Sequence, residues 1–185
     1  KYLDKALAEF EEAIRLDPGY VVFYNNRCWA YNGLGDYEQA VANYTQAIEL
    51  KPDFVGAYLS RGHAYHALGE YEQAIVDYDQ VLQIDSTEIY AYSNRGWSYF
   101  HVGEYEQAIA DFTQAIELGP SNPNIAAHYN NRGWVYYVQE DYERALADFS
   151  RAIELYPSAY AFIRRALVYD AMGDAEQAAN DFEQA

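Results

Sequence analysis

Residues 54–87 are FVGAYLSRGHAYHALGEYEQAIVDYDQVLQIDST, and residues 88–121 repeat the same pattern 34 positions later. Gly69 and Gly103 coincide at this spacing, as do the tyrosines and alanines that follow them. Self-similarity at a period of about 20 to 50 residues is typical of proteins built from stacked structural repeats. We therefore predict a repeat protein rather than a globular enzyme domain, and we look for function in columns of equivalent residues.

One period predicts a pair of antiparallel helices. Within residues 20–53, a first helix is expected at about 22–34 and a second at about 37–50. The second segment has apolar residues at the three-and-four spacing of a helix with one buried stripe. Gly35 suits the left-handed residue that ends a helix, and Pro52 prevents the second helix from continuing.

The same hairpin recurs in complete units at 20–53, 54–87, 88–121 and 125–158. Residues 1–19 match only a second helix, and residues 159–185 stop before their second helix is complete. Both partial units leave apolar stripes uncovered, so we expect one array over 1–185 that belongs to a longer array. The extra residues between the last two complete units lie in 119–124, which predicts a longer loop rather than a domain boundary.

Residues 58–65 and 74–78 combine aromatic, small and alanine positions, and the next unit repeats them at Tyr92, Gly96, Tyr99, Ala108, Phe112 and Pro120. This pattern resembles the tetratricopeptide repeat (TPR) family. Two columns depart from the family pattern, with tyrosine for tryptophan at Tyr24, Tyr58, Tyr92 and Tyr129, and arginine for leucine at Arg27, Arg61, Arg95 and Arg132. The resemblance implies an all-α, right-handed superhelical solenoid of antiparallel helical hairpins. It also implies that first helices line a concave groove for a peptide or helix, while second helices form the convex back.

The composition excludes several kinds of partner. The net charge is −17, with 12 Lys and Arg residues, so we expect neither nucleic acid nor an anionic membrane surface as a partner. The acidic residues gather at the starts of second helices, where they complement the helix dipole. Cys28 is the single cysteine, which excludes an internal disulfide and predicts a packed core position. The compartment stays open, with the cytoplasm as the default expectation.

The arginine column has a matching column of acids. Sixteen residues after Arg61, Arg95, Arg132 and Arg165 come Asp77, Asp111, Asp148 and Asp181. We predict that each pair forms a structural clasp, because an arginine fork and a carboxylate bind strongly when hydrogen-bonded. Contact of the arginines with an anionic ligand is the alternative. Arg27 has Asn43 at the same spacing, so a weaker clasp is expected there.

Aromatic residues mark the expected groove. Every tryptophan falls in one column of the first helices, formed by Trp29, His63, Trp97 and Trp134. The same face carries Asn130 one turn earlier and, three to four residues further along, His66, Phe100, His101 and Tyr137. Trp and Tyr are enriched at binding hot spots because they bury a large area at low entropic cost. Groove contact is our interpretation, and tryptophans that only wedge neighbouring helices apart are the alternative.

A neighbouring column carries amides at Asn26, Asn94 and Asn131, interrupted by Ser60. It is similar to the asparagine ladder in the TPR arms of O-linked N-acetylglucosamine transferases, in which amides hold the backbone of an extended peptide. An amide offers both a donor and an acceptor, which suits backbone recognition. Hydrogen bonds to helix ends or between repeats are the alternative. The carboxylate clamp of chaperone-binding TPR domains is matched only at Asn131 and Arg164, so we do not expect it.

Catalysis is not predicted. The chain has no phosphate loop, no nucleophile elbow and no convincing carboxylate pair in a pocket. His63, His66 and His101 lack the acidic or thiolate neighbours that would complete a metal site, so neither a metal nor a cofactor is expected. The sequence predicts a noncatalytic protein interaction scaffold that holds a peptide or helix in its groove. The rivals are a structural array that self-associates through its truncated ends and a substrate-recruiting arm of a larger enzyme.

Overall fold

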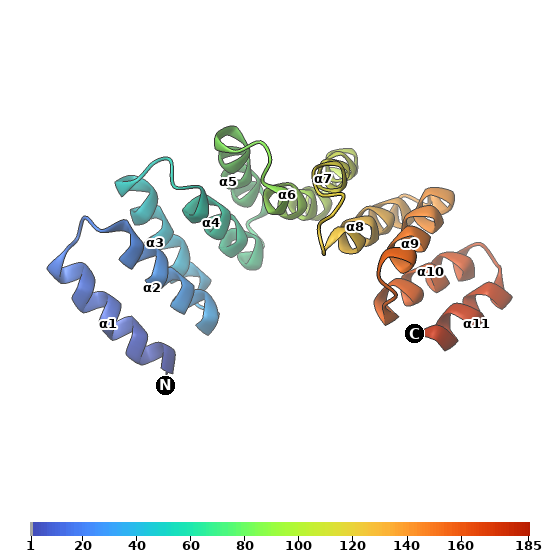
Figure 1. The fold of residues 1–185 in the computed structure, drawn as a ribbon, viewed down its shortest axis with the longest axis horizontal. Coiled ribbons are helices and arrows are strands. Elements are labelled where there is room, and N and C mark those ends of the chain that lie inside the picture. Colours follow the sequence, from blue (N-terminus) through green and yellow to red (C-terminus); the bar gives the residue numbers. More distant parts are fainter. Residues whose placement is uncertain (1) are drawn as a thin grey trace. The chain divides into compact units, whose positions relative to one another are not determined.

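The computed structural model describes residues 2–185, and these residues form helices and no strand (Figure 1). The helices are α1 (Tyr2–Leu16), α2 (Val21–Leu34), α3 (Tyr37–Leu50), α4 (Val55–Leu68), α5 (Tyr71–Ile84), α6 (Ile89–His101), α7 (Tyr105–Leu118), α8 (Ile125–Val138), α9 (Tyr142–Leu155), α10 (Ala159–Ala171) and α11 (Ala175–Gln184). The predicted all-α class is confirmed. The helices expected at about 22–34 and 37–50 are α2 and α3.

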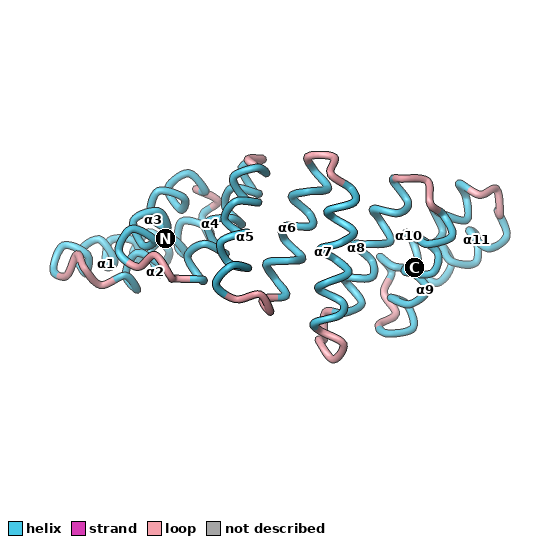
Figure 2. The backbone as a smooth tube through the Cα atoms, turned by 90° about the horizontal axis from the view of Figure 1, so that it is seen from above, coloured by secondary structure: helices cyan, strands magenta, loops and turns pink. Residues whose placement is uncertain are grey.

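The chain divides into two compact units, one up to Ser98 and one over Tyr99–Ala185, which we call unit 1 and unit 2. In unit 1 each helix from α2 to α4 packs against the helix before it and the helix after it. In unit 2 the helices from α7 to α11 pack in the same sequential way, and α8 also contacts α10. Short loops join the helices within each unit (Figure 2). Packing between neighbours in sequence is the mark of a repeat architecture.

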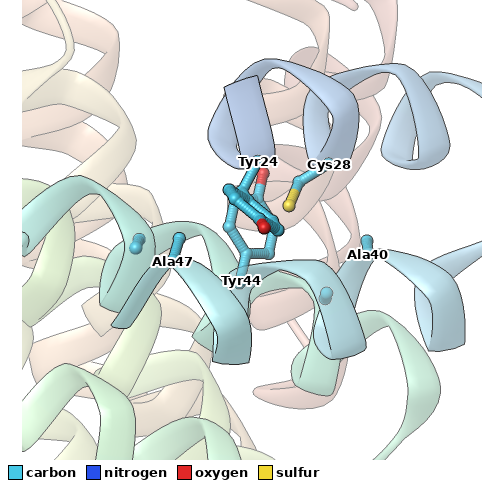
Figure 3. Close-up of a cluster of buried hydrophobic side chains, with 7 residues drawn as sticks. Tyr24, Cys28, Ala40, Tyr44 and Ala47 are labelled. Carbon is cyan, nitrogen blue, oxygen red and sulfur yellow. The ribbon is translucent and has the colours of Figure 1, made fainter. Parts of the chain in front are cut away.

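Small residues let the two helices of a hairpin approach closely. In unit 1, Ala40 and Ala47 of α3 are fully buried beside Tyr24 and Cys28 of α2, with Tyr44 between them (Figure 3). Burial raises the pKa of the Cys28 thiol to about 12. The predicted core role of this cysteine is confirmed, since a buried thiol in apolar surroundings behaves as a small apolar side chain.

The column of Cys28 otherwise holds glycine or alanine because a ring lies directly against it. A Cβ atom added to Gly62 would lie 2.8 Å from the ring of Tyr78, and one added to Gly133 would lie 3.0 Å from the ring of Phe149. Both rings belong to the second helix of the same hairpin. A larger side chain in this column would push the two helices apart.

Turns and caps separate the helices as the sequence predicts. Gly35 and Gly69 end α2 and α4 with φ values of 77° and 80°, in the left-handed region that favours glycine. The side chains of Asp36 and Asp141 then accept hydrogen bonds from backbone N–H groups in the first turns of α3 and α9. The acidic residues at these helix starts therefore act as caps and complement the helix dipole.

The predicted clasps are present in three hairpins. Arg61 donates to both carboxylate oxygens of Asp77, at 2.8 and 2.6 Å. Arg132 binds Asp148 with two bonds of 2.8 Å, and Arg165 binds its aspartate, Asp181, with two bonds of 2.7 Å. The structural interpretation of these arginines is confirmed.

Each of these arginines also reaches the preceding repeat. The third donor, Nη1, binds the hydroxyl of Thr45 for Arg61, of Thr113 for Arg132 and of Ser150 for Arg165, at 2.9 to 3.0 Å. One arginine therefore ties its own hairpin together and joins it to the second helix before it.

Two other arginines of the column differ. Arg95 of unit 1 binds Asp79 of α5, and its predicted pairing with Asp111 of unit 2 stays a prediction. The weaker clasp that we expected between Arg27 and Asn43 is wrong. The amide nitrogen of Asn43 donates to the backbone carbonyl of Gln39 at 2.7 Å. Within the described residues, neither the buried Nε of Arg27 nor the buried Oδ1 of Asn43 has a hydrogen-bond partner.

Candidate functional site

Unit 1 brings five of the predicted site residues together around two adjoining cavities. The first, which we call the Tyr44 cavity, has a volume of about 360 Å³ and is lined by Trp29, Asn32, Tyr44, Leu59, Ser60, His63, Tyr90 and Asn94. The second, the Tyr78 cavity, has a volume of about 160 Å³ and is lined by His63, His66, Tyr78, Asn94 and Trp97. The two cavities share His63 and Asn94. Because they share these side chains, the two cavities adjoin each other along the first helices of unit 1.

Trp29 is the most prominent apolar side chain of this site. It is 72 % exposed on α2, although a tryptophan usually buries most of its ring. His63 is also exposed, and Asn94, Trp97 and His66 are half-buried. Asn26 is exposed on the same helix as Trp29 but lines neither cavity. An exposed tryptophan beside concave, hydrogen-bonding walls is a feature of recognition surfaces.

The deep wall of each cavity is a tyrosine from a second helix. Tyr44 of α3 and Tyr78 of α5 are 2 % and 0 % exposed. Burial raises the pKa of Tyr44 to about 12 and also raises the pKa of Tyr78, because an ionised phenol is poorly solvated there. Both hydroxyls are therefore neutral at physiological pH and can donate as well as accept hydrogen bonds.

The two hydroxyls differ in their partners. The amide nitrogen of Asn32 donates to the hydroxyl of Tyr44 at 3.2 Å. His66 stands at the equivalent position in the next repeat, and its Nδ1 lies 3.1 Å from the hydroxyl of Ser98. The hydroxyl of Tyr78 is buried without a hydrogen-bond partner among residues 2–185.

Unit 2 arranges its predicted residues differently. The ring of Trp134 lies 5.2 Å from the ring of Tyr137 and 4.4 Å from the guanidinium of Arg164. This guanidinium also lies 4.0 Å from the ring of Tyr160 and donates to the backbone carbonyl of Asn130 at 3.1 Å. Arg164 is 8 % exposed, and burial lowers its pKa to about 10, so it remains charged at neutral pH.

The remaining predicted residues of unit 2 lie in two places. Asn130, which is buried, and Asn131, which is half-buried, contribute to a cavity of about 190 Å³ that also includes Tyr156, Ser158 and Tyr160. Phe100 packs against His101 with ring centroids 5.6 Å apart, and burial lowers the pKa of His101. Unit 2 therefore has an amide-lined cavity and an aromatic cluster that surrounds a buried cation.

We did not predict Tyr44, Tyr78 or Arg164 as residues of the site. The tyrosines come from second helices, which we assigned to the opposite face. One signal was available, because the column of Tyr44 and Tyr78 continues as phenylalanine at Phe112 and Phe149. The change from tyrosine to phenylalanine in this core column marks the repeats whose second helix carries a hydroxyl that packing does not require.

Two further features bear on the class of protein. Among the side chains that the structure describes, which exclude those of Lys1 and Asp4, no group of three or more His, Cys, Asp or Glu is placed to hold a metal ion. No helix in this part of the chain is both long and apolar enough to span a bilayer.

Sequence models of the repeat family match the chain over most of its length. A model described as TPR repeat matches residues 29–69 and 62–103, and models described as tetratricopeptide repeat match residues 87–158 and 159–185. The chain belongs to the tetratricopeptide repeat family. Proteins of this family are generally noncatalytic, and membership supports a role in protein interaction.

Several solved structures are similar to this chain in fold. MamA is 25% identical, with a TM-score of 0.76 over 83% of this chain and 89% of that chain. YrrB is 22% identical, with a TM-score of 0.74 over 95% of this chain and 89% of that chain, and it is described as a TPR protein with an unusual peptide-binding site. BtubC (BKLC) from P. vanneervenii is 21% identical, with a TM-score of 0.82 over 99% of this chain and 86% of that chain. No curated protein matches the sequence.

Proposed function

We propose that this protein is a noncatalytic interaction scaffold that binds a peptide or helix on the first helices of unit 1. The observation that carries the proposal is the pair of adjoining cavities, the Tyr44 cavity and the Tyr78 cavity, beside the exposed ring of Trp29. Trp29 would bury its ring against the ligand, which is the usual role of a hot-spot tryptophan. Asn94, which lines both cavities, would hold the ligand through its donor and acceptor.

The chemistry of the cavity walls supports a ligand whose contacting groups are uncharged. Neither cavity is lined by Lys, Arg, Asp or Glu. Recognition would then rest on burial of apolar surface and on neutral hydrogen bonds. Although the net charge of the chain is −17, affinity should depend only weakly on salt, since exposed charges far from a site are screened. The description of YrrB as peptide-binding is consistent with this proposal.

Calorimetric titration of peptides from a display library tests the proposal. Trp29→Ala is expected to weaken binding by about 2 kcal/mol, and Asn94→Ala by about 1 kcal/mol on most peptides alike. Val76→Ala is the matched control, because Val76 is an exposed apolar residue on the second helix α5. Circular dichroism verifies the fold of each variant. Full affinity in Trp29→Ala and Asn94→Ala, with loss in Val76→Ala, would move the interaction to the other face.

Self-association is the second candidate, favoured by the exposed ring of Phe182 on α11. Light scattering over a range of concentrations measures it. A dimer that disappears when a polar helix is appended after α11 would support this candidate, and a constant monomer mass would exclude it.

A further inference from the structure

The hydroxyl of Tyr78 is a buried polar group that the fold leaves without a partner. Its side chain is 0 % exposed, and among residues 2–185 no atom is placed to form a hydrogen bond with the hydroxyl. Burying a hydroxyl without a hydrogen bond is costly, so such groups in native proteins usually have a role. Tyr78 also lines a cavity of about 160 Å³ that is large enough for a side chain.

Equivalent positions show that packing does not require this hydroxyl. Phe112 and Phe149 occupy the same column in the following repeats, and both are 0 % exposed. The ring of Tyr78 packs against Gly62 in the way that the ring of Phe149 packs against Gly133. At Tyr44 the hydroxyl is retained and has Asn32 as its partner. Of the two tyrosines in this column, Tyr78 is therefore the one whose hydroxyl has no hydrogen-bond partner within the described residues.

The walls of the Tyr78 cavity define what could satisfy this hydroxyl. Asn94 offers an amide donor and an amide acceptor, and His63 offers ring nitrogens of both kinds when neutral. Trp97 supplies an apolar wall. No charged side chain lines the cavity, so an anion or a cation would lose its hydration without a compensating charge. The complementary group is neutral and carries both a donor and an acceptor.

We propose that the Tyr78 cavity is a subsite for the side-chain carboxamide of a glutamine or asparagine in the bound peptide. This subsite rests on the proposed function, since it assigns one side-chain pocket of the same peptide site. The carboxamide forms hydrogen bonds with the hydroxyl of Tyr78 and with the amide of Asn94, while its methylene groups lie against Trp97. A carboxamide matches these walls better than a hydroxyl, because it has separate donor and acceptor atoms.

The test is a double-mutant cycle between the protein and a selected peptide. Peptides from a display library are bound to the parent chain and to Tyr78→Phe, a substitution that copies the residue found in later repeats. Replacing the preferred Gln by Met is expected to weaken binding to the parent about tenfold and to weaken binding to Tyr78→Phe less than twofold. Tyr20→Phe is the matched control, because it removes the hydroxyl of an exposed tyrosine that lines neither cavity, and it should respond like the parent.

Several outcomes would overturn the subsite without touching the proposed function. The selected peptides could show no preference for Gln or Asn, or they could prefer Glu over Gln. The substitution Gln→Met could also cost the same affinity in the parent and in Tyr78→Phe.

A second experiment tests the subsite without any peptide. Propionamide is titrated into the protein, and the NMR signals of the Tyr78 ring are followed. Saturable shifts that propionate does not cause and that Tyr78→Phe lacks would support it, and their absence would contradict it. Full peptide affinity in Trp29→Ala, with the tenfold cost of Gln→Met retained, would contradict the proposed contact of Trp29 and leave the subsite standing.

Discussion

The hairpin α2–α3 of unit 1 and the hairpin α8–α9 of unit 2 have the same secondary structure, but they differ in which buried polar groups they contain. In α2–α3 the arginine Arg27 lacks a carboxylate, whereas in α8–α9 the equivalent Arg132 holds Asp148 with two hydrogen bonds. Conversely, α3 keeps a hydroxyl at Tyr44 where α9 has Phe149. The hairpin α4–α5 has both the Arg61–Asp77 clasp and Tyr78, so the clasp and the cavity wall vary independently between repeats. Stability and recognition are adjusted at different columns.

Removing the carboxylate of the clasp in unit 2 tests this comparison. Among the substitutions that we propose, it should lower the free energy of unfolding the most. Asp148→Asn gives unit 2 the arrangement of Arg27 and Asn43, and it leaves a half-buried guanidinium without its charge partner. We expect the free energy of unfolding to fall by about 2 to 3 kcal/mol. Urea unfolding followed by circular dichroism measures it. An effect below about 0.5 kcal/mol would show that the clasp contributes little to stability.

The reverse exchange should stabilise unit 1. Asn43→Asp places a carboxylate sixteen residues after Arg27, as in the three clasps observed. The expected gain is about 1 kcal/mol, smaller than the loss in unit 2 because a new buried carboxylate must also be desolvated. The same unfolding experiment applies. If Asn43→Asp lowers the free energy of unfolding, the cost of desolvating the carboxylate exceeds the gain from pairing with Arg27. Arg27→Leu, which removes the unpaired guanidinium instead, serves as a comparison.

The comparison also shows what could be predicted from the sequence. The period of 34 residues, with Gly35 and the acidic caps, predicts the helices closely because these are local signals repeated many times. The clasps could be predicted because the spacing of arginine and aspartate is constant. The missing hydrogen-bond partner of Tyr78 could not be predicted from the sequence. It depends on the orientation of His66, whose Nδ1 lies against the hydroxyl of Ser98. The cluster around Arg164 likewise depends on side-chain orientation, which no column of residues reveals.

A buried histidine distinguishes the units in their response to pH. His128 is 4 % exposed, and neither ring nitrogen has a hydrogen-bond partner among residues 2–185, while Ala57 occupies the same position in unit 1. Burial lowers the pKa of His128, whereas an unfolded histidine has a pKa of about 6.5. At pH values near and below 6.5, the unfolded chain therefore binds more protons at this histidine than the folded chain does. The free energy of unfolding falls as the pH decreases.

We expect a loss of about 1 kcal/mol between pH 7 and pH 5.5 at this site. His128→Ala should flatten the dependence, whatever its effect on stability at pH 7. His101, whose pKa is also lowered by burial, acts in the same direction, so part of the dependence will remain. Urea unfolding at several pH values measures the slope. An unchanged slope in His128→Ala would contradict the assignment.

Indole N–H signals in a ¹⁵N NMR titration test the central claim most directly, because the chain has 3 tryptophans and single substitutions assign them. The probe is one peptide selected from the display library. If the first helices of unit 1 bind the peptide, the signals of Trp29 and Trp97 should shift together and saturate at the dissociation constant found by calorimetry. Unchanged Trp29 and Trp97 indole signals at peptide concentrations that saturate binding in calorimetry would contradict the account.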